Sequence, residues 1–519
     1  MVNRLFFLFA FLFLSSCSIT DTENVLNSGS SALSFNLLGA KYDDSVKLSS
    51  EASVVKGNIT YRRSKMQNNS VLVTPSNFIT AELSGEDDNS QALSKAAFFG
   101  GRITAVSGNP IISGVKFRVI AYSQSDGSYQ GHQDYTVGQL GLPMILDKSE
   151  VYNIIAYSYG TSTLPAISLG EQNNINRARV NYDDINRDFM YQNIVFTPEN
   201  STETLNITLR HKVAQITTIV NSGSLENITG VIGGVLTPHY SDGSISLSSG
   251  VLSGRTILSP GVALNFSDYN TPIVTSTPVF VNADTDGSST GGFSADLVLS
   301  GTTKTISLFN SFKITPGTKS NLTINLIRCG AKISDVEWKN FMCQNLGATV
   351  GINPLNAEAG NHGAKYQWGR KVPALTQEQD QNNPLIIDGW VASAAALSSW
   401  TDTTKTANDP CPTGYRVPTS TQWDSVIKNN NITSIGITWN SDPGNYSTGI
   451  LIGTGLFLPA AGFRSAAFNG LLDDRGLIGY YWSSTSGSKG LMLKFSAGSM
   501  PILNPFNRPN GISIRCIAE

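Results

Sequence analysis

The chain has 519 residues, of which only 14% are charged, and its 36 basic and 38 acidic residues give a net charge of −2. No basic stripe is present that could neutralise phosphates, which argues against a nucleic-acid-binding protein. A chain of this length exceeds what one hydrophobic core can hold, so several domains are expected. The sparse charge, the 48 glycines and the short runs of Val, Ile and Tyr are typical of an extracellular all-β protein.

The N-terminus has the features of an export signal. An unbroken apolar run over residues 5–14 is too short to cross a bilayer core of about 30 Å as a helix, at about 1.5 Å per residue. The run ends in Leu14-Ser15-Ser16-Cys17, which resembles a bacterial lipobox. We therefore expect a lipoprotein signal peptide over residues 1–16, lipidation of Cys17, and a lipid anchor in the outer membrane at the cell surface. The alternative is an ordinary secretory signal with a chance cysteine.

Residues 17–34 are polar and predict a flexible tether. Strand-like runs then recur between turn signals over residues 35–200. Apolar and polar residues alternate over 115–121, an SDGS turn follows at 125–128, and VYNIIAYSYG at 151–160 is a second strand pattern. This period of two places one face in a core and the other in water, which indicates paired sheets.

The same pattern continues over residues 201–328, where Leu205, Ile207 and Leu209 alternate with polar residues. The stretches LDKSEVYNIIAYSYG, DFMY and LNITLRHKVAQITTIV resemble the fimbrillin family of Bacteroidetes, which comprises pilus subunits and their relatives. The resemblance implies two consecutive β-sandwiches of transthyretin-like fold, over residues 35–200 and 201–328. It also implies association with other fimbrial subunits by strand addition.

The composition changes at residue 329. All seven tryptophans lie beyond this point, as do four of the five cysteines, Cys329, Cys343, Cys411 and Cys516. In an oxidising compartment these cysteines are expected to form two disulfide bonds, and the count alone allows three connectivities. We therefore expect a separate domain over residues 329–519.

Six blocks of this last domain resemble, in order and approximate spacing, the Fibrobacter succinogenes major paralogous domain. They are VEWKNFMCQNLGA (336–348), YQWGR (366–370), CPTGYRVPTSTQW (411–423), LPAAGFR (458–464), GYYWSST (479–485) and GISIRCIAE (511–519). The resemblance implies an α+β domain of C-type-lectin-like fold, so the chain is expected to be mainly β, with two sandwiches followed by this domain. It further implies the disulfide pairs Cys411–Cys516 and Cys329–Cys343.

Under this resemblance, the block CPTGYRVPTSTQW contains a turn that leads into a helix. Thr419 or Ser420 can cap the helix, because a hydroxyl oxygen accepts hydrogen bonds from the first free backbone amides. Trp423, Val426 and Ile427 are spaced three and four residues apart and would form its buried face.

The loops around residues 463–481 and 503–510 are the candidate ligand-binding region. They combine glycine and asparagine with aromatic and arginine side chains, which is a composition that recognition surfaces use. The candidate ligand-binding residues are Arg464, Arg475, Tyr480, Phe506 and Arg508. The alternative is that the aromatic residues belong to the core and the arginines are solvated.

No pattern indicates a catalytic site, a metal site or a cofactor. The four histidines are scattered without a zinc-binding pattern, and no serine lies in a nucleophile elbow. Asp473 and Asp474 could bind calcium, but a solvated loop is the commoner outcome, and the calcium-ligand patterns of C-type lectins are missing. We therefore expect no enzymatic activity.

These features predict a cell-surface lipoprotein that acts as an adhesin through its last domain, as a fimbrial tip or accessory subunit. The ligand would be a glycan or a protein. The alternatives are a lipid-anchored glycan-binding protein for nutrient capture and a purely structural surface protein. YRRSK at 61–65 is a candidate for processing at Arg62 or Arg63, and a solvated basic loop is the alternative.

Replacing Cys17 with alanine should move the protein from the membrane fraction to the soluble fraction, because the acyl chains on this thiol would be its membrane attachment. Partition between detergent and aqueous phases measures the shift, with Ser18→Ala as the matched control. Equal recovery of the native and Cys17→Ala chains in the detergent phase would contradict lipidation at this residue.

Overall fold

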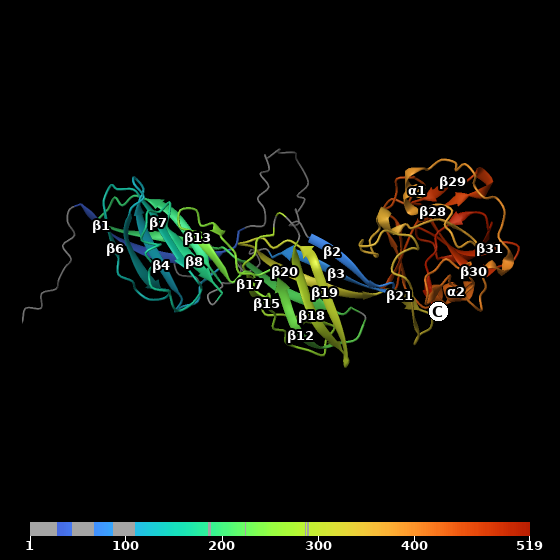
Figure 1. Ribbon diagram of the computed structural model, residues 1–519, viewed down its shortest axis with the longest axis horizontal. Helices are drawn as coiled ribbons and strands as arrows, with labels where there is room; N and C mark the ends of the chain where they lie inside the picture. The colour runs from blue at the N-terminus through green and yellow to red at the C-terminus, as the bar shows by residue number, and fades with distance from the viewer. Residues whose placement is uncertain are drawn as a thin grey trace, which may run out of the picture.

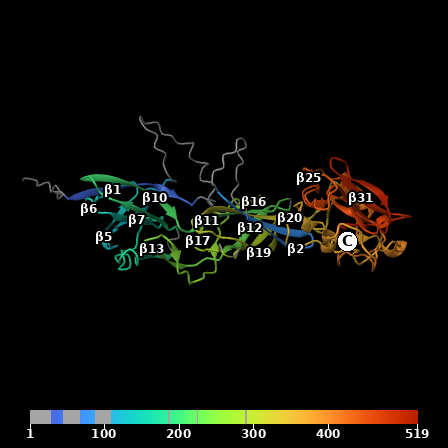
Figure 2. The same cartoon turned by 90° about the horizontal axis from the view of Figure 1, so that it is seen from above.

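The computed structural model describes residues 29–43, 67–86, 109–184, 188–223, 225–285, 287 and 290–519. The described chain is mainly β-structure, as expected, and forms three bodies in a row along the long axis (Figure 1, Figure 2). The signal peptide, Cys17, most of the expected tether and YRRSK lie outside the described residues. Within the described ranges, no helix has the length and hydropathy needed to cross a bilayer.

The first body contains a seven-stranded sheet that curls on itself. In order across the sheet, its strands are β5 (Tyr129–Thr136), β4 (Lys116–Ser123), β7 (Tyr152–Ser158), β9 (Met190–Phe196), β10 (Thr202–His211), β1 (Ser30–Lys41) and β6 (Met144–Asp147). β1 runs parallel to β10, yet the ring of its Phe35 lies 5.5 Å from that of Tyr135 on β5. Strands near the two ends of the sheet therefore share one core.

A small sheet and the adjoining loops cover the other face of this curled sheet. Its strands are β14 (Leu252–Ser253), β13 (Asp242–Ser246) and β8 (Arg179–Asp183). Because both faces are covered, β4 is buried from Phe117 to Tyr122, and the expectation of one face in water is wrong for this strand. Even Arg118 is buried, and its guanidinium pairs with Asp134 and Glu171.

The second body is a sandwich of two sheets around one core. One sheet has the order β16 (Ile273–Thr275), β11 (Ala214–Asn221), β20 (Lys319–Arg328), β3 (Asn77–Gly85) and β2 (Gln67–Thr74), with β17 (Val279–Val281) also paired to β11. The facing sheet consists of β15 (Val262–Ala263), β12 (Ile228–Thr237), β18 (Gly291–Leu299) and β19 (Thr302–Phe312).

The two sandwiches are interleaved along the chain, so the expected boundary at residue 200 is wrong. β2 and β3 precede most of the first body in sequence but belong to the second body. β3 pairs along its whole length with β20, from Asn77 opposite Arg328 to Gly85 opposite Ser320. Conversely, β10 lies beyond residue 200 and completes the first sheet. The first strand also begins at Ser30, within the expected tether.

The third body, the C-terminal domain, combines short sheets with short helices. Its sheets are β21 (Gly330–Lys332) with β22 (Trp338–Asn340); β23 (Tyr366–Gln367), β33 (Gly511–Ile512), β28 (Ala461–Ser465) and β29 (Leu471–Arg475); β24 (Tyr415–Arg416) with β34 (Ile517–Ala518); β25 (Ile432–Ile435), β26 (Gly449–Ile452) and β27 (Leu456–Pro459); and β30 (Ile478–Ser486), β31 (Gly490–Ser496) and β32 (Ile502–Phe506). Its helices are α1 (Gln377–Asn382), α2 (Ser420–Lys428) and the short 3-10 turns η2 (Ala359–Asn361), η3 (Leu397–Ser399) and η4 (Ala466–Phe468).

The expected helix is α2, and its cap is confirmed. Thr419 is the N-cap: its hydroxyl accepts from the Gln422 amide at 3.0 Å, while the Gln422 side chain accepts from the Thr419 amide at 2.8 Å. Trp423 and Val426 are buried and Ile427 packs partly against the same core.

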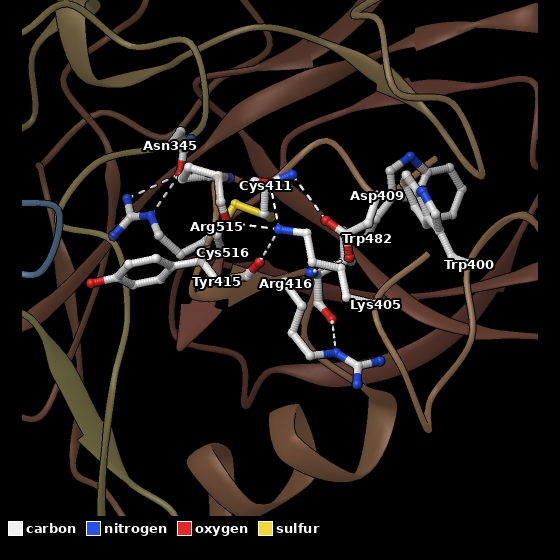
Figure 3. The surroundings of a disulfide bond; sticks show 12 residues. Asn345, Trp400, Lys405, Asp409, Cys411, Tyr415, Arg416, Trp482, Arg515 and Cys516 are labelled. Carbon is white, nitrogen blue, oxygen red and sulfur yellow. Dashed lines mark hydrogen bonds between the residues drawn. A yellow bond between two sulfur atoms is a disulfide. The ribbon is translucent and has the colours of Figure 1, made fainter. Parts of the chain in front are cut away.

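Both expected disulfide pairs are present in the C-terminal domain. Cys411 and Cys516 join the segment before α2 to the last strand, across 105 residues of sequence (Figure 3). The carboxylate of Asp409 accepts from the Cys411 amide at 2.9 Å, and the Lys405 ammonium donates to the Cys411 carbonyl at 2.6 Å. The bond is thus set in a network of polar contacts that fixes the start of the helix.

The second disulfide, Cys329–Cys343, lies at the junction with the second sandwich. The amides of Cys329 and Cys343 donate to the carbonyls of Ser76 and Pro75, in the turn between β2 and β3, at 2.8 and 2.7 Å. Both cysteines are buried against Phe78 of β3. Only Cys329 separates β20 from β21, so the two bodies are joined without a flexible linker.

Removing Cys411–Cys516 by a double alanine substitution should lower the stability of the C-terminal domain more than removing Cys329–Cys343. In the chain-entropy model, closing a loop of about 100 residues stabilises by about 4.7 kcal/mol, against about 3 kcal/mol for about 15 residues. Tryptophan fluorescence during thermal unfolding reports on this domain alone, since it holds all seven tryptophans. A larger loss of Tm in the Cys329→Ala, Cys343→Ala chain would contradict this ranking.

Candidate recognition surface on the C-terminal domain

The expected ligand-binding residues lie mainly on strands rather than in loops. Arg464 is on β28, Arg475 ends β29, Tyr480 is on β30 and Phe506 ends β32, while Arg508 follows that strand. Figure 1 shows α1, β28 and β29 together on one side of the domain, with β21 on the side next to the second sandwich. Arg464 and Arg475 therefore belong to one sheet of the domain, and Tyr480 and Phe506 to another.

Arg464 and Arg475 are buried and share one carboxylate, that of Asp380 on α1. Arg464 Nε donates to Asp380 Oδ1 at 2.7 Å, and Arg475 Nη2 donates to Asp380 Oδ2 at 2.6 Å. All three side chains are almost fully enclosed. The prediction that the two arginines contact a ligand is therefore wrong, because both guanidinium groups pair with Asp380 and are closed to solvent.

Arg464 also fixes the loop that follows α1. Its Nη2 donates to the carbonyls of Asp380 and Asn383 at 2.7 and 2.6 Å. Its Nη1 donates to the carbonyls of Leu385 and Gly470 at 3.2 and 3.1 Å. One guanidinium thus binds the loop after α1 and the turn between β28 and β29, so these two segments lie side by side.

The buried cluster contains two further titratable groups, Lys365 and His362. Burial lowers the pKa of Lys365 to about 7, and its ammonium donates to the carbonyls of Ala461 and Gly462 at 2.6 and 3.1 Å. Burial, with the positive charges of Lys365 and Arg475, lowers the pKa of His362 to about 3, so the imidazole is neutral. Burial alone would raise the pKa of Asp380, but the nearby cations hold it below its usual value.

The aromatic residues of the expected surface pack on one another. The ring of Phe463 lies 5.1 Å from that of Tyr480 and 5.2 Å from that of Phe506. The Tyr480 hydroxyl donates to Asp474 Oδ2 at 2.5 Å. Tyr480 is buried and Phe506 is half-buried, so the alternative that these aromatics belong to the core is the better description.

Arg508 is half-buried and supports a neighbouring loop. Its Nη1 donates to the Ala395 carbonyl at 2.8 Å, and its guanidinium lies 5.5 Å from the centre of the Trp368 ring. Gln367 bridges the same region, with its amide donating to the carbonyls of Val391 and Pro509 at 2.7 Å each. Arg508 therefore shapes the loop over residues 388–397 as well as offering part of its own surface.

Three exposed apolar residues lie at this place; Phe468 is in the expected loop over residues 463–481, whereas Leu385 and Ile386 were not expected. Leu385 and Ile386 follow α1, and Phe468 lies in η4; their side chains are 65%, 55% and 66% exposed. The Ile387 amide donates to the Asn469 carbonyl at 2.7 Å, which joins the two segments. We call Leu385, Ile386 and Phe468 the apolar rim.

Trp390 lies beside the rim and depends on a glycine. Gly470 has a φ of 75°, and a Cβ atom there would lie 2.4 Å from Trp390 Cε3. The Trp390 indole donates to the Pro509 carbonyl at 3.2 Å. The ring therefore closes over the turn that carries Phe468, and an alanine at position 470 would displace it.

The histidines outside this domain have structural contacts. His211 Nδ1 lies 2.6 Å from Asp188 Oδ1, and His239 Nε2 lies 2.7 Å from Asp184 Oδ1. Among the described residues, no three His, Cys, Asp or Glu side chains gather in a way that could hold a metal ion.

No protein-family model matches the chain, and no curated protein matches it. Among solved structures, a candidate cell adhesion protein of Bacteroides fragilis is 12% identical over 60% of this chain and 97% of its own, with a TM-score of 0.31. A fimbrial assembly protein of Parabacteroides distasonis is 9% identical over 44% of this chain and 86% of its own, with a TM-score of 0.27. A candidate cell adhesion protein of the same organism is 11% identical over 50% and 87%, with a TM-score of 0.28. TM-scores this low do not establish a common fold.

Asp380→Asn should lower the free energy of unfolding of the C-terminal domain by about 3–5 kcal/mol at neutral pH, because it leaves two buried arginines without their counter-charge. The folded state holds the pKa of Asp380 below its unfolded value, so the carboxylate stabilises fully above the unfolded pKa of about 3.9 and loses this effect as the pH falls below it. Denaturant titration followed by tryptophan fluorescence measures both effects, with the exposed Asp388→Asn as control. A loss no larger than that of the control would contradict the role of Asp380.

Proposed function

We propose that this protein is a lipid-anchored, non-enzymatic adhesin of the cell surface, acting as a fimbrial tip or accessory subunit. The observation that carries the proposal is the apolar rim, an exposed hydrophobic surface on a domain at one end of an extended molecule. β1, where the described chain begins, lies at the opposite end (Figure 1). An anchor on the N-terminal side would leave the C-terminal domain far from the membrane.

The rim has the physical properties of a binding surface. Its apolar side chains are exposed to water. A partner that covers them removes this apolar surface from water, which stabilises the complex. The buried Arg464–Asp380 contacts hold the two rim segments in place before binding. A prearranged surface loses little conformational entropy when it binds, which favours affinity.

Strand addition to other fimbrial subunits belongs to the same proposal. A subunit that adds a strand to this protein needs a sheet edge whose backbone N–H and C=O groups are unpaired. In the described sheets, β5 and β6 form the two edges of the first sheet, and β2 is an edge of the second sandwich. Each of these edges could accept an extended segment without unfolding a core.

Charged substitutions on the rim should weaken adhesion without unfolding the domain. We expect Leu385→Asp and Phe468→Asp each to lower adhesion at least tenfold, since replacing an anchor residue costs more than about 1–2 kcal/mol. Beads carrying the full chain are tested on a panel of immobilised extracellular-matrix proteins and oligosaccharides. Ile437→Asp is the matched control, because Ile437 is 101% exposed on another loop of the same domain.

Two outcomes would contradict the adhesive role of the rim. One is adhesion that is unchanged by both rim substitutions while thermal unfolding shows folded proteins. The other is an equal loss of adhesion in the Ile437→Asp control, which would show that any added charge on this domain interferes.

A further inference from the structure

A polar cavity of about 350 Å³ lies between the second sandwich and the C-terminal domain. Its floor is the outer face of the sheet at β2 and β3, where Asn68 pairs across the strands with Glu82 and Ser70 pairs with Thr80. Its roof is the loop over residues 351–358 of the C-terminal domain. Figure 1 shows β2 and β3 in the second body, adjoining the C-terminal domain.

The outer face of this sheet carries a row of polar side chains that leads to the cavity. The Asn221 amide on β11 donates to Asn325 Oδ1 on β20 at 3.1 Å, and the Asn325 amide donates to Thr80 Oγ1 at 3.0 Å. The row continues through Ser70, which is the cross-strand partner of Thr80. The Ser70 hydroxyl donates to the Gly351 carbonyl at 3.0 Å. The sheet face is therefore polar where it meets the other domain, although a hydrophobic contact would have stabilised the junction more directly.

The roof loop is held by buried amides from its own domain. Asn361 donates to the carbonyls of Asn353 and Asn356 at 2.8 and 2.9 Å, and Gln344 donates to the carbonyl of Ile352 at 3.3 Å. Asn361 and Gln344 are both buried. These hydrogen bonds fix the loop that forms the roof of the cavity.

The lining has hydrogen-bonding capacity that the protein does not use. Within the described part of the chain, the side chains of Asn68 and Glu82, which share the outer face of the sheet, make no hydrogen bond or ion pair. Asn353, Asn356 and Glu358 complete the polar lining from the other domain. A ligand that offers both donors and acceptors could bond to amides and carboxylates on both walls at once.

The charges of the lining restrict the class of ligand. The lining holds two carboxylates, Glu82 and Glu358, and no lysine, arginine or histidine, so it disfavours phosphates, sulfates and acidic sugars. A single metal ion is a poor occupant, because the volume is in the range of pockets for small organic ligands and no third acidic, His or Cys ligand lies close by among the described residues. The amides and carboxylates of the two walls match the hydroxyl and acetamido groups of a neutral saccharide, which both donate and accept hydrogen bonds.

We propose that the cavity between β2, β3 and the loop over residues 351–358 binds a neutral saccharide unit. This site is separate from the apolar rim, and the inference does not rest on the proposed adhesive role. Both domains contribute to it, so saccharide binding would also strengthen the junction between them.

Calorimetric titration of the full chain with neutral disaccharides (cellobiose, lactose and chitobiose) and with an acidic one, a di-galacturonate, tests the proposal. We expect at least one neutral disaccharide to bind and the acidic one not to bind. Glu82→Gln and Asn353→Ala should each weaken binding at least tenfold, and Asn68→Trp, which fills the cavity from an exposed strand position, should abolish it. Glu150→Gln, at an exposed glutamate of the first sandwich, should leave binding unchanged.

Three results would overturn the proposal. They are the absence of binding for every neutral disaccharide at millimolar concentration, preferred binding of the di-galacturonate, and equal affinity in the native and Asn68→Trp chains. A fourth contradicting result can come from titration with calcium chloride alone. If calcium binds saturably to the native chain and not to the Glu82→Gln chain, the cavity is a cation site. None of these results bears on adhesion through the rim, which the Leu385→Asp and Phe468→Asp chains test separately.

Discussion

The arrangement of this protein depends on the contact between the turn joining β2 to β3 and the disulfide-bonded start of the C-terminal domain. Two backbone hydrogen bonds from Cys329 and Cys343 to Ser76 and Pro75 extend the pairing of the sandwich into the next domain. The apolar contact of both cysteines with Phe78 excludes water from these bonds. The polar cavity then lies directly beside this contact, so a single junction sets both the direction of the last domain and the walls of the candidate saccharide site.

Within the C-terminal domain, the buried charges have a comparable role. A carboxylate between two guanidinium groups is costly to bury, and hydrophobic residues could fill the same volume with equal or greater stability. Arg464 instead fixes the relative position of three segments. Its guanidinium donates to a carboxylate and to carbonyls in α1, in the following loop and in the β28–β29 turn. The exposed apolar rim is thus supported by charged groups that solvent and ligand do not reach.

The sequence predicted what is local in the chain and missed what depends on distant partners. Strand patterns in the sequence located β4, β7 and β10, and the capping pattern at Thr419 located α2. The interleaving of the sandwiches was not predictable, since the pattern of β3 does not indicate that its partner is β20, more than two hundred residues away. Arg464 and Arg475 looked like loop residues because their counter-charge, Asp380, lies 84 and 95 residues earlier. Phe468 of the rim lies in the loop expected to bind a ligand, but Leu385 and Ile386 were missed because an isolated Leu or Ile in a loop carries no signal of exposure.

The central claim is that the second sandwich and the C-terminal domain form one rigid unit that presents the rim and the cavity in fixed positions. Pulsed electron paramagnetic resonance tests it directly, with spin labels on Ile232→Cys in β12 and Ile437→Cys in the C-terminal domain, both at exposed positions. The account predicts one narrow distance distribution, which broadens when Cys329 and Cys343 are replaced by serine. A broad distribution in the chain with both disulfides intact would contradict it.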